Sequence, residues 1–178
     1  MIYDQASGLV TRPPDPDLQA RVELLERLGL GEPDPEFDTF ASELAEAVGE
    51  ACGMVNLVTD RQYFIGLHFP KGGDFPPVGR TMSLNEGYCP EVVSRRRALP
   101  LPDVCASPRF AGNRVFDVLH VRTYTGVPLI HTPTGLVIGS LCVVGPKARP
   151  MSKAQERLDV VKGRGEVLMK RVMRNAGD

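Results

Sequence analysis

The chain has 178 residues, 42% of them hydrophobic, which suits one domain with its own buried core. Its formal net charge of −1 and pI near 6.3 give no broad positive field, which argues against binding to nucleic acid or to anionic membranes. The first ten residues do not have the pattern of a signal peptide, and no apolar run approaches the ~20 residues that span a bilayer. The four cysteines do not have the spacing of a zinc site. We therefore expect a cytoplasmic protein with free thiols.

Helical patterns occupy the beginning of the chain. Residues 1–14 show no periodicity, and we expect a flexible arm there, followed by a single domain over residues 15–178. A first helix is expected from about Asp15, because apolar residues then recur on one face until Gly29. A second helix with a wide apolar stripe follows the turn at 33–35.

Strand patterns follow. A strand over Met54–Thr59 and another over Tyr63–His68 flank a polar turn and predict a hairpin. A loop rich in proline and glycine leads to a short strand near Arg80–Ser83, and then to a helix over about Asn85–Arg97. The Leu99–Pro102 run contains two prolines, which favours a strand at a sheet edge or an extended segment.

Two strands and a helix complete the pattern. After a long connection we expect strands over Arg122–Ile130 and Leu136–Val144. Ser152 with Gln155 matches a capping box, which predicts a terminal helix over about 152–174. Runs of strands flanked by helices at both ends indicate an α+β fold around an antiparallel sheet.

The segment 109–144 resembles the signature of the GAF domain, a sensing and interaction module. It combines an Arg-Phe-Ala-Gly-Asn loop with the two late strands, and the likeness extends over about 21–158. The sequence is similar to the GAF modules that precede bacterial kinase or cyclase outputs. The resemblance implies a central antiparallel sheet of five or six strands. Helices 1, 2 and the C-terminal helix would cover one face, and pocket-covering loops with a short helix the other.

A pocket for a small molecule is also implied, with its ligand and any cofactor left open. The candidate binding residues, by matching position, are Tyr88, Cys89, Asp103, Arg109, Phe110, Asn113, His120, Arg122 and Tyr124. No metal ligand set is expected.

Several of these residues have a second, purely structural interpretation. Cys89 could be a nucleophile or redox sensor activated by the start of a helix, or a small residue that packs the helix onto the sheet. Arg122 could hold an anionic ligand, or it could pair with Asp103 or Asp117 and fix the long loop. His120 is the preferred residue for a haem, whereas His131 is expected to point to solvent.

The leading hypothesis is a sensory or regulatory domain that binds a small molecule. It would signal through a homodimer of its terminal helices or through contacts with a separate output protein. An alternative is an enzyme similar to the free methionine sulfoxide reductases, using Cys89 and Cys105. Against it, the last strand carries Leu141–Val144 where those enzymes have acidic residues. A third possibility is an interaction scaffold with a collapsed pocket.

Overall fold

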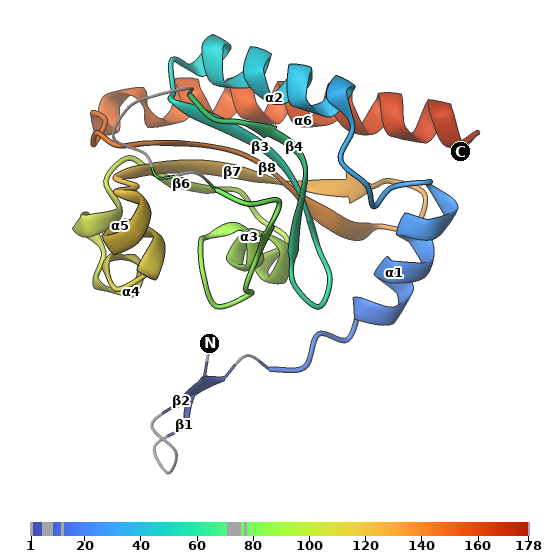
Figure 1. Cartoon of the computed structure of the whole chain (residues 1–178), viewed down its shortest axis with the longest axis horizontal. Helices are drawn as coiled ribbons and strands as arrows, with labels where there is room; N and C mark the ends of the chain where they lie inside the picture. Colours follow the sequence, from blue (N-terminus) through green and yellow to red (C-terminus); the bar gives the residue numbers. More distant parts are fainter. Residues whose placement is uncertain (1, 5–8, 12, 71–75, 77, 178) are drawn as a thin grey trace.

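A six-stranded antiparallel sheet forms the centre of the molecule (Figure 1). A computed structural model describes residues 2–4, 9–11, 13–70, 76 and 78–177. The strands lie in the order β5-β4-β3-β8-β7-β6. Their bounds are β3 Cys52–Val58, β4 Gln62–His68, β5 Thr81–Met82, β6 Leu99–Leu101, β7 Thr123–His131 and β8 Leu136–Gly145. Pro100 thus belongs to an edge strand, as the sequence indicates, and Pro102 directly follows it.

Helices cover both faces of this sheet and confirm the expected α+β architecture (Figure 1). Helices α1 (Leu18–Arg27), α2 (Pro35–Val48) and α6 (Ala154–Ala176) contribute to the core on one face. The other face carries α3 (Cys89–Arg95), the 3₁₀ turn η1 (Val104–Ala106), α4 (Pro108–Ala111) and α5 (Arg114–Leu119). A second 3₁₀ turn, η2 (Met151–Lys153), precedes α6.

The N-terminal segment contains a separate two-stranded ladder. In it β1 (Ile2–Asp4) pairs with β2 (Leu9–Thr11) in antiparallel fashion. The flexibility expected for residues 1–14 stays a prediction, because residues 1, 5–8 and 12 lie outside the described part.

Helix α2 is fixed by local signals and by two strand glycines. The Asp34 side chain accepts a hydrogen bond from the backbone N–H of Glu36, and the helix ends at Gly49, whose φ of 69° is left-handed. A Cβ atom on Gly53 of β3 would overlap the carbonyl oxygen of Ala41 on α2. A Cβ atom on Gly66 of β4 would similarly overlap the helix backbone. The helix therefore rests directly on the backbone of the sheet.

Two hydrophobic layers result, one on each face of the sheet. The helix-side layer contains Leu44, Leu141 and Val161, each fully buried. The opposite layer joins the sheet to α3 and to the segment that contains α5. Among the described residues, no helix has the combination of length and hydropathy needed to cross a bilayer.

Three sequence expectations are wrong in detail. The third helix begins at Cys89 rather than near Asn85, because Gly87 has a φ of 73° and interrupts helical geometry. The capping box at Ser152 does not form, since this residue lies in η2 and α6 has no side-chain cap. His131 does not point to solvent: it is buried, and its Nδ1 atom lies 2.8 Å from the Thr134 hydroxyl.

The two glycines inside α6 differ in their surroundings, which gives a first prediction. A Cβ atom on Gly163 would meet nothing within 4 Å, whereas one on Gly165 would lie 3.1 Å from Val127 Cγ2. Gly163→Ala should raise the free energy of unfolding by roughly 0.5–1 kcal/mol, because alanine loses less backbone entropy in a helix. Urea denaturation measures this gain. Gly165→Ala is the matched control, and an equal gain in both variants would contradict the packing of α6 on β7.

Candidate functional site

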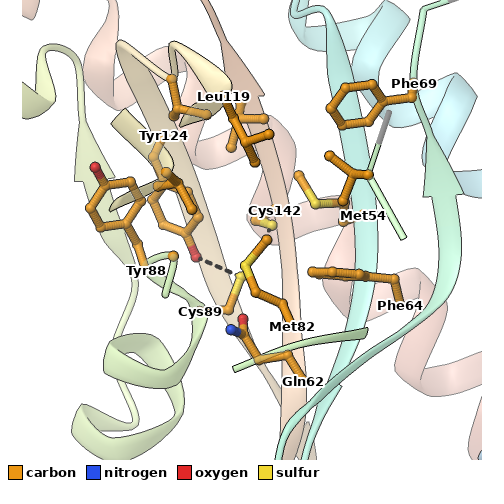
Figure 2. A pocket seen from close by; sticks show the side chains of 15 residues that line it. Met54, Gln62, Phe64, Phe69, Met82, Tyr88, Cys89, Leu119, Tyr124 and Cys142 are labelled. Carbon is orange, nitrogen blue, oxygen red and sulfur yellow. Dashed lines mark hydrogen bonds between the residues drawn. The ribbon is translucent and has the colours of Figure 1, made fainter. Parts of the chain in front are cut away.

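A small hollow lies between the sheet and the α3–α5 side of the domain (Figure 2). Its volume is about 40 Å³, room for roughly two or three water molecules. Apolar side chains form most of its wall. The lining residues are Met54, Gln62, Phe64, Phe69, Val78, Met82, Gly87, Tyr88, Cys89, Val115, Leu119, Val121, Tyr124, Cys142 and Val144.

Tyr124 of β7 reaches into this hollow from the sheet. The residue is 1% exposed, and its ring lies across Gly126, where a Cβ atom would overlap the phenol. Its hydroxyl donates a hydrogen bond to Cys89 Sγ over 3.4 Å (Figure 2). Tyr88 packs beside it with the ring centroids 5.2 Å apart. Gly126 thus provides the space that lets the phenol reach the start of α3.

Two sulfur atoms meet at the wall of the hollow. Cys89 Sγ of α3 and Cys142 Sγ of β8 are 3.4 Å apart, and both residues are buried (Figure 2). The hydrogen bond from Cys142 lowers the pKa of Cys89 to about 6, against the opposing effect of burial. The same interaction and burial raise the pKa of Cys142. Burial also raises the pKa of Tyr124, so its hydroxyl stays a proton donor.

A buried polar group lies beside the sulfur pair. The Asn56 amide donates to Gln62 Oε1 over 3.0 Å, and Gln62 in turn donates to the carbonyl oxygens of Ser83 and Glu86. These hydrogen bonds connect the turn before α3 to the sheet. Asn56 Oδ1 and Ser140 Oγ are buried and have no hydrogen-bond partner in the described part of the chain, and both side chains help to lower the pKa of Cys89.

Five of the predicted site residues lie at the hollow or directly behind its wall. Tyr88, Cys89 and Tyr124 line it. The Phe110 ring packs edge-on against Tyr88 with centroids 5.9 Å apart. Asn113 bridges the chain before α3, accepting from the N–H of Gly87 and donating to its carbonyl oxygen. These contacts connect the parts of the segment from α3 to α5, residues 89–119, which we call the α3–α5 cap.

The predicted charged residues are not among those that line the hollow. Arg122 precedes β7 and forms a forked ion pair with Asp103, at distances of 3.0 and 3.1 Å from its Nη2 atom. Because of this guanidinium, the pKa of Asp103 lies below its usual value. These contacts agree with the structural interpretation of Arg122, in which its ion pair with Asp103 fixes the loop after β6.

The remaining predicted residues also lie elsewhere. Arg109 pairs with the buried Glu91 of α3. His120 is exposed and ends α5 with a φ of 52°. Cys105 is exposed in η1 and does not line the hollow. No three His, Cys, Asp or Glu side chains gather as a metal site in the described part of the chain.

Sequence reasoning missed the polar residues of the central strands. The sequence patterns do not identify Cys142, Asn56, Gln62 or Ser140 as site residues. A signal was present, since Asn56 and Ser140 are single polar residues within apolar strands, and they are cross-strand partners in the β3–β8 ladder. A polar residue inside a strand buried on both faces requires a partner.

Together these features define an α+β domain with helices on both faces of an antiparallel sheet and a small apolar hollow. A family model for the GAF domain matches residues 32–161. This match covers more than half of the chain, so the protein belongs to the GAF domain family. No curated protein matches the sequence significantly.

Solved structures with the same fold include proteins of different activities. A putative GAF sensor protein from Burkholderia vietnamiensis has a TM-score of 0.59 and 19% identity, with 90% of this chain and 92% of that chain covered. A type II free methionine-R-sulfoxide reductase from Thermoplasma acidophilum has a TM-score of 0.59 and 13% identity, with coverages of 78% and 91%. The PixJ GAF domain from Thermosynechococcus elongatus has a TM-score of 0.53 and 16% identity, with 83% of this chain and 88% of that chain covered. At these low sequence identities, the similarity shows a shared fold and not a shared activity.

Proposed function

We propose that this protein is a sensory or regulatory GAF domain that binds a small, largely apolar molecule between its sheet and the α3–α5 cap. The hollow lined by Tyr88 and Tyr124 is the observation that carries the proposal. Family membership supports a regulatory role, and similar solved structures include a protein named as a sensor and a photoreceptor domain.

The wall of the hollow sets the chemistry of the ligand. The aromatic, methionine and aliphatic side chains favour an apolar molecule, because the polar atoms of Gln62 and the Tyr124 hydroxyl are already hydrogen-bonded to other groups of the protein. An anionic ligand is disfavoured, because Arg122 and Arg109 are engaged by carboxylates outside the wall. The volume of about 40 Å³ is far below the roughly 300–1,000 Å³ of sites for drug-sized ligands, so only a small guest fits without movement of the cap.

Partner contacts belong to the same proposal. The apolar stripes of α1 and α6 are used inside the domain, where Leu25 and Leu168 join one buried cluster. A homodimer through the terminal helices, or a contact with a separate output protein, therefore has to use their outer surfaces. On α6 that surface includes Val167, which is 55% exposed.

A sulfoxide reductase is the second candidate, and it is favoured by the buried thiol at Cys89 and by the fold shared with such enzymes. Among the described residues, the wall of the hollow offers no carboxylate to hold the ammonium group of a free amino acid. For this reason we place the reductase below the sensor.

Binding of apolar probes tests the sensor proposal directly. The chain contains no tryptophan, so indole fluorescence can be followed without a tryptophan background when it is excited beyond the tyrosine absorption band. Benzene and indole are larger than the hollow of about 40 Å³, so their entry requires a shift of the α3–α5 side of the domain. We expect saturable binding of both probes, and at least about tenfold weaker binding to Leu119→Phe, because the larger side chain fills the hollow. Fluorescence titration and calorimetry give the two affinities.

Val118→Phe is the matched control, since Val118 is on the same helix but 48% exposed and does not line this hollow. Its probe affinity should equal that of the unmodified protein. Failure of both probes to bind saturably, or equal loss in the two variants, would remove the hollow as the ligand site. Turnover of free methionine sulfoxide would instead favour the reductase.

A further inference from the structure

The sulfur pair at the wall of the hollow has a chemistry of its own. We propose that Cys89 and Cys142 form a redox site, at which a small hydroperoxide such as hydrogen peroxide converts the two thiols into an intramolecular disulfide. This inference is independent of the proposed apolar ligand, because it requires only the two cysteines and their immediate neighbours.

The geometry places the sulfurs within reach of a bond. They are 3.4 Å apart, and a disulfide bond of about 2.05 Å requires them to approach by only about 1.4 Å. Cys89 lies on α3 and Cys142 on β8, which are 53 residues apart in the chain. Because α3 is a separate short element packed on the sheet, a small shift of it can close this distance.

Hydrogen bonds from neighbouring side chains make Cys89 the nucleophile of the pair. It accepts a hydrogen bond from the Tyr124 hydroxyl, and the Cys142 thiol is placed to donate to it once it ionises, so both neighbours stabilise a thiolate. The Ser140 hydroxyl also lowers the pKa of Cys89 and has no hydrogen-bond partner among the described residues, so it gains an acceptor when the thiol ionises. Burial raises the pKa of Cys52 to about 12, so this cysteine stays a thiol and serves as an internal control.

The reaction proceeds in two balanced steps. The Cys89 thiolate attacks one peroxide oxygen, the O–O bond breaks, and the departing oxygen takes up a proton and leaves as an alcohol or water. Cys89 is then a sulfenic acid, oxidised by two electrons. The Cys142 sulfur attacks it, the S–S bond forms, the S–O bond breaks, and the hydroxide leaves as water with the Cys142 proton. A dithiol reductant of the cell would return both thiols by exchange.

The size of the hollow suits this oxidant. Both cysteines line it, and a space for roughly two or three water molecules admits hydrogen peroxide. The more exposed Cys105 lies outside this space and lacks a neighbouring sulfur among the described contacts. Exposure alone would favour Cys105, so the site of oxidation separates the two explanations.

Peptide mapping tests the proposal on the full chain. Each cysteine lies in a different tryptic peptide, namely residues 28–61, 81–95, 98–109 and 123–147. After treatment of the reduced protein with hydrogen peroxide, we expect the peptides 81–95 and 123–147 to be joined, with Cys52 still available to alkylation after unfolding. Oxidation confined to Cys105, with Cys89 and Cys142 still free thiols, would overturn the proposal.

Variants identify the order of the steps and the role of Tyr124. Cys142→Ser should stop at a sulfenic acid on Cys89 that dimedone captures, and Cys89→Ser should leave Cys142 unmodified. Oxidation of the unmodified protein should accelerate as the pH rises through about 6, because the thiolate is the reactive form. Tyr124→Phe should move this profile to higher pH, and an unchanged profile would contradict the assigned positioning role.

Discussion

Replacing Glu50 by alanine should lower the free energy of unfolding by about 3–5 kcal/mol, because it leaves two guanidinium groups without their carboxylate. The Glu50 side chain is fully buried between α2 and β3. It accepts hydrogen bonds from Arg157 of α6 and from Arg149, whose Nε lies 3.0 Å from Oε1. Arg149 also donates to the carbonyl oxygen of Gly49 at the end of α2. This carboxylate therefore connects α6 to the start of the sheet.

Urea denaturation measures this loss, and Glu156→Ala is the matched control. Glu156 also pairs with a cation, Lys153, but both side chains are mostly exposed, so their removal should leave the midpoint unchanged. A similar small effect in both variants would show that the buried network does not stabilise the fold. Loss of the helical signal near 222 nm in Glu50→Ala would locate the effect in the helix layer.

The second large effect is expected from Gly53→Ala. The new methyl group would overlap the carbonyl oxygen of Ala41, a backbone atom inside α2 that cannot rotate away. Either the helix lifts from β3 or the strand bends, and we expect a loss of about 3 kcal/mol, at the upper end for overpacked cores. Thermal and urea unfolding measure the change.

Gly31→Ala controls for the general effect of removing a glycine. A Cβ atom there would meet nothing within 4 Å, so its stability should stay within about 0.5 kcal/mol of the unmodified protein. If Gly53→Ala were equally mild, the close seat of α2 on the sheet would be wrong.

The elements with local signals were predictable from the sequence, and those shaped by tertiary contacts were less so. The start and end of α2 follow from Asp34 and Gly49, whose roles require only neighbouring residues. The third helix was placed too early, because apolar spacing cannot reveal the positive φ at Gly87. The short helices α4 and α5 have too few residues for a periodic pattern.

The candidate site was predictable only in part, for a physical reason. Matching position in the family signature predicts both Tyr124 and Arg122, but only Tyr124 lines the hollow, since Arg122 precedes the strand and pairs with Asp103. Cys142 carries no such signal, because nearly every residue of β8 is buried and alternation no longer separates the two faces. Its contact with Cys89 arises from the packing of α3, which no local pattern encodes.

The sheet described above ends in strands that give little backbone for another chain to pair with. On one side β5 has only two residues, and on the other β6 contains Pro100, which has no N–H to donate. Within the described residues, extension of this sheet into an intermolecular one is therefore disfavoured. A second molecule that contacts this sheet is therefore expected to do so through side-chain surfaces rather than through backbone pairing at β5 or β6.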